Sequence, residues 1–150
     1  MGIINKDINQ ADFRNNRNKA MVNILFTHAW MVDHIKSFVK TENITPQQYN
    51  ILRILRGAGK PLSTLQLRER MLDKMSDTSR IVERMVAKGL LHKTVSEKDK
   101  RMVDVSITSE GMLLLEKLDE RNVELDGIVH LNDEELETLN NLLDKLRNNH

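Results

Sequence analysis

The chain has 150 residues, of which 39% are hydrophobic, 30% are charged and only 3% are aromatic, and its formal net charge is +1. This length and composition suit one mostly helical domain and are short for two. The absence of cysteine excludes a disulfide framework, a cysteine-ligated zinc site and a thiol redox switch. We expect neither a signal peptide nor a membrane span, and therefore a soluble, cytoplasmic protein with no membrane partner.

The charges are unevenly distributed along the chain. Residues 53–105 carry 13 basic and seven acidic side chains, whereas residues 106–150 carry four basic and 11 acidic ones. A basic middle and an acidic end suit a protein that presents one face to phosphates and keeps the other away from them. The alternative is that these blocks are solvated helix faces.

The first predicted helix runs from about Asp12 to Val39. Its apolar positions keep the three-to-four residue spacing of an amphipathic helix, at Met21, Ile24, Leu25, His28, Val32, Ile35 and Val39.

Two helix starts follow, each with a capping box. Thr45-Pro46-Gln47-Gln48 supplies a cap, a proline at the first helical position and a glutamine three residues after the cap. Ser63-Thr64-Leu65-Gln66 repeats the arrangement directly after the helix-breaking run 57–61.

The next helix is predicted from Ser76, its expected cap, to Lys88, before Gly89 ends it. Ile81, Met85 and either Val82 or Val86 form the expected buried stripe. Arg80 stands where an apolar partner for Met75 would complete a hydrophobic staple, so the first turn is free to project. Short polar residues followed by arginine can hydrogen-bond base edges there. The alternative is an ordinary amphipathic surface helix.

A strand pair is predicted after this helix. Residues 90–95 lead to the charged tip Asp99-Lys100-Arg101, and residues 102–107 return with Val103, Val105 and Ile107 alternating against polar positions. A basic hairpin beside a pair of short helices forms a wing, which reaches the DNA backbone or minor groove.

Thr108 is the predicted cap of a helix that carries Met112, Leu115, Leu118 and Leu125, and a last helix begins at Asn132 with Leu136, Leu139, Leu143 and Leu146 on one face. Such stripes exceed what a monomer of this size covers, which favours a homodimer. The predicted fold is therefore mainly α with a small β-hairpin wing, in a single domain over residues 1–150. A winged helix-turn-helix at about 45–111 is flanked by dimerisation helices at about 9–40 and 112–150.

In combination, three motifs resemble the multiple-antibiotic-resistance regulator (MarR) family of transcription factors. They are the run 88–93 (Lys-Gly-Leu-Leu-His-Lys), the tip Asp99-Lys100-Arg101 and the run 107–111 (Ile-Thr-Ser-Glu-Gly). The resemblance extends over nearly the whole chain. It implies a homodimer whose recognition helices enter successive major grooves of a pseudo-palindromic operator and whose DNA affinity falls when a small molecule binds.

The resemblance also assigns roles to individual residues. Arg101 corresponds to the wing arginine at the minor groove, and Asp99 to the acid that orients it. Lys93 stands where many members have arginine, which retains a phosphate contact but loses bidentate geometry. An effector pocket would use His28, Trp30, Tyr49 and Arg53, each of which could instead be an ordinary core or surface residue.

Other classes of function fit the sequence less well. His28 and His34 lie six residues apart and His92, His130 and His150 are scattered, so we expect no metal and no cofactor. The acidic run 133–137 is explained by a helix start, so we do not expect an enzyme. The main alternative is a winged-helix protein-interaction module without sequence-specific DNA binding.

The sequence thus predicts a regulator, most simply a repressor, whose partners are duplex DNA, a second copy of itself and a small-molecule effector. The candidate DNA contacts are Ser76, Asp77, Thr78, Ser79, Arg80, Arg84, Lys93, Asp99, Lys100 and Arg101.

Overall fold

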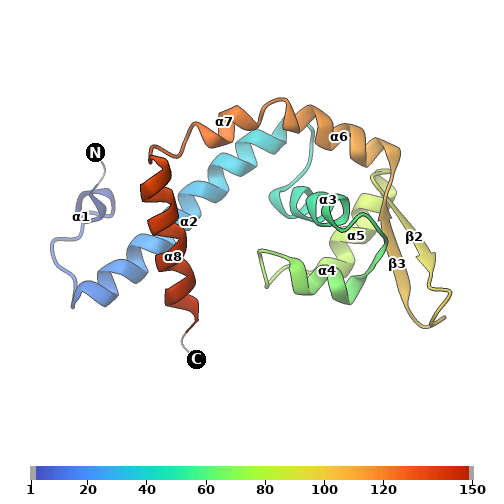
Figure 1. The fold of residues 1–150 in the computed structure, drawn as a ribbon, viewed down its shortest axis with the longest axis horizontal. Coiled ribbons are helices and arrows are strands. Elements are labelled where there is room, and N and C mark those ends of the chain that lie inside the picture. Colours follow the sequence, from blue (N-terminus) through green and yellow to red (C-terminus); the bar gives the residue numbers. More distant parts are fainter. Residues whose placement is uncertain (1–2, 149–150) are drawn as a thin grey trace.

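A computed structural model describes residues 3–148. Helices and a small sheet alternate along this part of the chain (Figure 1). The elements are α1 (Ile4–Asp7), α2 (Asn16–Lys40), α3 (Pro46–Ala58), β1 (Leu62–Ser63), α4 (Thr64–Arg70), α5 (Thr78–Ala87), β2 (Leu91–Val95), β3 (Val103–Ile107), α6 (Ser109–Asp119), α7 (Asn122–Asp126) and α8 (Asp133–Arg147). The predicted fold class, mainly helical with a β-hairpin wing, is confirmed.

Capping boxes form at three helix starts: the two predicted at Thr45 and Ser63, and one at Asn132, where only the helix start was predicted. Thr45, Ser63 and Asn132 each accept a hydrogen bond from the backbone N–H three residues on, and the side chain at that position bonds back. These contacts need only a short run of sequence, which is why the starts of α3, α4 and α8 were predictable.

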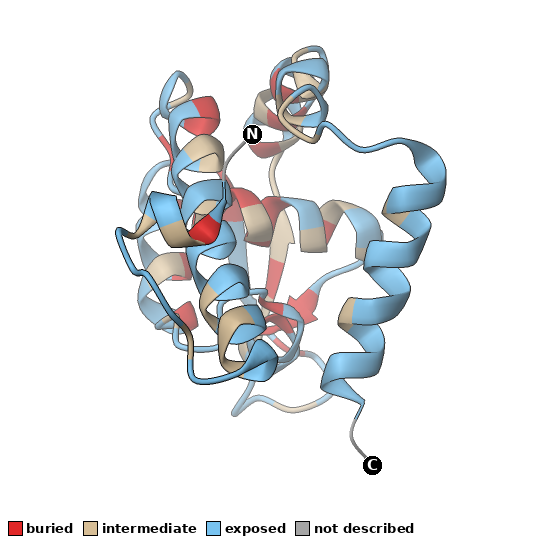
Figure 2. Cartoon of the chain, turned by 90° about the vertical axis from the view of Figure 1, so that its left-hand side faces the viewer, coloured by how far each residue is buried: buried red, intermediate tan, exposed pale blue. Residues whose placement is uncertain are grey.

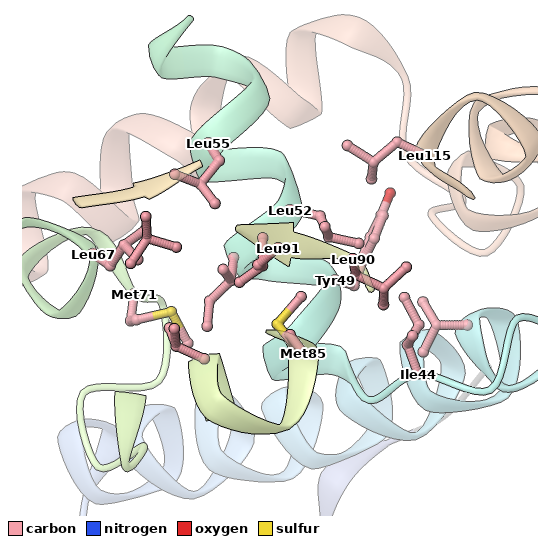
Figure 3. Packing of buried hydrophobic residues seen from close by; sticks show 14 of the residues in the cluster. Ile44, Tyr49, Leu52, Leu55, Leu67, Met71, Met85, Leu90, Leu91 and Leu115 are labelled. Carbon is pink, nitrogen blue, oxygen red and sulfur yellow. The ribbon is translucent and has the colours of Figure 1, made fainter. Parts of the chain in front are cut away.

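The core lies where α3, α4, α5 and the sheet meet (Figure 3). Leu52 and Leu55 of α3 face Leu67 of α4 and Met85 of α5, and Leu115 of α6 closes the cluster. The sheet has the order β1-β3-β2, and Val105 in its central strand is paired with both Leu62 and Lys93. The two-residue strand β1 was not predicted; it forms through its pairing with β3.

A compact junction joins the end of α5 to the start of α6. The Thr108 hydroxyl donates to the Gly89 carbonyl at 2.7 Å and accepts from the Gly111 N–H at 3.1 Å, while the Thr108 N–H donates to the Leu90 carbonyl. A methyl group on Gly111 would lie 2.5 Å from the Leu90 carbonyl oxygen. Position 111 therefore has no room for a side chain.

Two predicted helices differ in the structure. The first helix begins at Asn16 rather than Asp12, and its cap is Asn15. The helix predicted from Thr108 to Leu125 is interrupted between Asp119 and Asn122, so that Leu125 belongs to α7.

The interruption places Arg121 against α2. Its guanidinium lies 4.9 Å from the centre of the Phe38 ring and donates to the Thr41 hydroxyl at 2.6 Å. Two residues before Arg121, Asp119 accepts from Arg56 of α3 at 2.5 Å. These contacts come from distant sequence, so the helical periodicity around residue 120 could not reveal the break.

Apolar side chains remain exposed on the terminal helices. No residue of α8 is buried, and α2 buries only Phe38 and Val39. Figure 2 shows α8 pale blue along almost its whole length. The exposed apolar residues of these two helices include Met21, Leu25, Phe26, Trp30, Leu139, Leu142 and Leu146.

We predict that Gly111→Ala lowers stability by about 1–3 kcal/mol, because overpacking outweighs the roughly 1 kcal/mol by which alanine favours a helix interior. Gly57→Ala is the matched control, since no atom lies within 4 Å of the added methyl group and its φ is not positive. It should stabilise the fold by about 0.5–1 kcal/mol. Urea unfolding of both variants measures the difference, and equal effects would contradict the close packing at Gly111.

Candidate nucleic-acid interface

The helix α5 begins one residue later than the sequence indicated. Asp77, not Ser76, is its N-cap, and the Asp77 carboxylate accepts from the Arg80 N–H at 3.2 Å. The predicted cap at Ser76 is therefore wrong, because the free backbone N–H of Arg80 in the first turn donates to Asp77. The residue before the observed cap is Ser76, which is polar, so the first turn still lacks a hydrophobic staple.

One candidate contact on α5 faces the core. Thr78 is 1% exposed and packs on the same side as Val82 and Met85. Its side chain is not available to a duplex, which corrects its inclusion among the DNA contacts. Thr78 lies four residues before Val82 and seven before Met85, so it shares their buried face, whereas Ser79, Arg80, Glu83 and Arg84 remain exposed on the other side.

A cross-element ion pair connects α5 to the wing. Lys93 of β2 lies 2.5 Å from the carboxylate of Glu83, and this hydrogen bond lowers the pKa of Glu83. The pairing of Glu83 depends on how β2 crosses α5, which the local sequence does not determine. Part of the Lys93 charge is therefore already balanced on the exposed face of α5.

Asp99 braces Arg101 at the wing tip. The Asp99 carboxylate accepts from the Arg101 backbone N–H at 3.0 Å and from its Nε at 3.2 Å, and the Met102 N–H closes the turn onto the Asp99 carbonyl. The Arg101 guanidinium and then its backbone N–H hold the pKa of Asp99 below its usual range. The Arg101 side chain is nevertheless 91% exposed, so its charge points outward in a fixed position.

The wing and α5 form one continuous region. β2 packs against α5, and the hairpin extends beyond it at the lower right of Figure 1. Exposed residues of α5 and the tip residues Lys100 and Arg101 therefore lie at two points of this region. Such an arrangement can contact a duplex at a groove and at an adjacent stretch of backbone.

The structure does not gather the four candidate effector residues around a cavity. Tyr49 is buried with Arg53 5.5 Å above its ring, and Trp30 stacks on His34 of its own helix. One hollow of about 480 Å³ lies between the α2–α3 turn and α5, and one of about 220 Å³ lies between α2 and α7. None of the four lines either hollow.

Within residues 3–148, no group of three or more histidine or acidic side chains could hold a metal ion. His150 lies outside the described residues. In the same part of the chain, no helix is long and apolar enough to cross a membrane.

Comparison with known proteins identifies this arrangement. Residues 42–102, which include α3, α4, α5, β2 and the wing tip, match the model of the MarR family. The winged-helix part of the chain thus matches the MarR family. The HTH-type transcriptional repressor MdtR of Bacillus subtilis (strain 168) is 31% identical to the chain over 80 residues, which cover 53% of this chain and 51% of that repressor. The chain thus matches only about half the length of this curated relative.

Solved structures of transcriptional regulators extend the likeness in fold beyond that segment. A mutant MarR from E. coli complexed with operator DNA superposes with a TM-score of 0.77 at 22% identity, covering 91% of this chain and 99% of that one. The organohalide-sensing regulator RdhR in its 2,4-dichlorophenol-bound form gives 0.80 at 23% identity, covering 93% and 86%. Both show that the flanking helices share the MarR fold.

We predict that Arg101→Ala raises the pKa of Asp99 toward its usual value, but only in part. The guanidinium hydrogen bonds disappear, whereas the backbone N–H of residue 101 still donates to the carboxylate. Carboxyl ¹³C NMR over an acid titration measures the shift. Lys100→Ala is the control and should leave the titration of Asp99 unchanged. If the pKa of Asp99 is unaltered in Arg101→Ala, the Arg101 guanidinium does not bond to the Asp99 carboxylate.

Proposed function

We propose that the chain is a homodimeric transcriptional repressor that binds a pseudo-palindromic duplex operator. The observation that carries the proposal is the wing tip, where Asp99 holds an exposed Arg101 beside the polar face of α5. A fixed guanidinium can enter a narrow minor groove without the entropic cost of ordering a free side chain. The α5 face then lies in the neighbouring major groove, and an operator on the chromosome implies a cytoplasmic location.

The charge distribution supports this orientation. The acidic segment after residue 105 forms α6, α7 and α8, and α6 and α7 lie along the top of Figure 1, away from the wing tip. Phosphates therefore meet the basic segment 53–105 and avoid the acidic helices. Repression is supported by the similarity to MdtR, a transcriptional repressor, and binding to an operator by the E. coli MarR complex.

The exposed apolar faces of α2 and α8 support the homodimer. Leu139, Leu142 and Leu146 of α8 stay more than a third exposed in the single chain, as do Leu25 and Trp30 of α2. Burying these side chains against a second copy removes apolar surface from water. A two-fold dimer also sets two α5 helices about one turn of DNA apart.

A small-molecule effector completes the proposal. Its support is the RdhR structure bound to 2,4-dichlorophenol, since that protein shares the fold. His28, Trp30, Tyr49 and Arg53 stay as predicted contacts, and a pocket that includes them would need side chains from the partner subunit.

We expect Arg101→Ala to weaken operator binding about 5- to 150-fold, the range for a lost base or groove contact of 1–3 kcal/mol. Lys100→Ala should lower affinity for all sequences alike and flatten the salt dependence by about one unit of slope. Fluorescence anisotropy on fragments selected by the purified protein, at several salt concentrations, measures both effects. Lys117→Ala on α6 serves as the control that leaves binding unchanged.

Failure of every duplex to bind better than random DNA would favour the protein-interaction module instead. Unchanged affinity of Arg101→Ala at physiological salt would remove the wing from the interface.

We expect Leu139→Glu to convert the dimer into a monomer, because a buried carboxylate without a partner costs several kcal/mol. Light scattering after size exclusion measures the mass. Leu72→Glu is the matched control: Leu72 is 86% exposed, but in the turn between α4 and α5 rather than on a terminal helix. A dimeric Leu139→Glu variant would argue against the α8 face as the interface.

A further inference from the structure

One acidic side chain stands on the outermost line of α5. The buried line of this helix is formed by three side chains, Thr78, Val82 and Met85. At about 100° per residue, the opposite line is formed by Arg80, Glu83 and Ala87, all of which are exposed. Because the alanine side chain is short, only Arg80 and Glu83 extend far from the helix on this line. A surface that meets this face of α5 therefore meets one cation and one carboxylate.

The Glu83 carboxylate is paired on one side and open on the other. Its Oε1 accepts a hydrogen bond from the Lys93 Nζ of β2 at 2.5 Å. Among residues 3–148, no hydrogen bond is formed to its Oε2, and the side chain is 65% exposed. The bond to Lys93 also lowers the pKa of Glu83, so the carboxylate is ionised at neutral pH. Glu83 thus presents an acceptor oxygen that no protein donor occupies.

A structural role explains this carboxylate only in part. Glu83 lies in the middle of α5, outside its first and last turns, so it neither caps the helix nor balances its dipole. The ion pair with Lys93 connects β2 to α5, but both partners are accessible to solvent, and such pairs contribute little to stability. Leu91 of β2 is buried in the core and already holds the strand beside α5. Stability therefore gives little reason for an acid at this position.

An acid at this position also opposes DNA binding in general, because a carboxylate near phosphates is repelled by every sequence alike. The repulsion is offset where a base presents a hydrogen-bond donor to the carboxylate. In the major groove, cytosine presents its N4 amino group as a donor, whereas thymine presents the O4 acceptor at the corresponding place. The same carboxylate can therefore favour one pyrimidine and reject the other.

We propose that Glu83 is a specificity-determining residue that accepts a hydrogen bond from a cytosine N4 amino group in each half-site of the operator. Lys93 is its positioning residue, because it holds the carboxylate from the side of β2 and leaves Oε2 open. A half-site with thymine in place of this cytosine meets two acceptors and binds more weakly. This inference rests on the proposed function, since it requires α5 to lie in the major groove of a duplex.

The experiment uses the full-length protein and an operator fragment that the protein selects from random sequences. Each C·G pair of one half-site is changed in turn to T·A, and fluorescence anisotropy measures the affinity. For the wild type, we expect one position at which the change weakens binding about 5- to 150-fold. In Glu83→Gln the loss at this position should shrink to about threefold or less, because an amide offers both a donor and an acceptor.

Glu97→Gln is the matched control. Glu97 is also exposed and acidic, but it lies in the hairpin between β2 and β3. Both variants lose one negative charge, which acts on the affinity for all sequences alike. Only Glu83→Gln should change the ratio of affinities for the C·G and T·A fragments.

The role of Lys93 is tested by the same ratio. Lys93→Gln should lower the ratio severalfold, and Lys93→Arg, which keeps a cation beside Glu83, should restore it. A lysine that serves only the fold or a phosphate contact would change the overall affinity and leave the ratio unchanged.

An unchanged ratio in Glu83→Gln would overturn the inference while operator binding, and with it the proposed function, stands. A selected operator without a discriminating C·G pair would do the same. A wild type that binds no duplex better than random DNA would overturn both. Thermal unfolding of each variant separates a lost preference from a lost fold, and Glu83→Ala, which has neither donor nor acceptor, serves as the second variant at this position.

Discussion

The hydroxyl of Thr108 connects the end of α5 to the start of α6. It donates to the Gly89 carbonyl and accepts from the Gly111 N–H, and so satisfies groups of both helices with one side chain. The close approach at Gly111 lets α6 pack directly on the Leu90 backbone. Because β2 begins one residue after Leu90, this junction also sets where the wing leaves the helices. The relative placement of α5, the wing and the flanking helices depends on it.

Some cations of the winged-helix surface are paired with a carboxylate and others are not. Arg80, Lys93 and Arg101 each form an ion pair with a carboxylate, which reduces the net positive charge around them. Such cations favour shape-dependent contacts over long-range attraction. Arg84, Lys88 and Lys100 have no such partner among residues 3–148. Paired and unpaired cations therefore stand side by side on the wing and α5.

Local sequence was sufficient for the helix caps and the wing but not for features that depend on distant contacts. Thr45, Ser63, Thr108 and Asn132 cap their helices as predicted because each contact spans three residues. Two competing caps stand next to each other at Ser76 and Asp77, and the sequence pattern did not decide between them. Thr78 was assigned to the exposed face although its spacing to Val82 and Met85 puts it on the buried one. The break before α7 and the pairing of Glu83 with Lys93 come from tertiary packing, so neither has a signal in helical periodicity.

The burial of α2 at only one end has a mechanical consequence. Its 25 residues span about 37 Å, and its buried side chains are Phe38 and Val39, next to the turn that leads into α3. The helix thus behaves as a rigid lever with its pivot beside Arg121. A tilt of about 5° displaces the free end by about 3 Å for a helix of this length. A contact that tilts α2 at its free end therefore also changes the orientation of α5 and the wing.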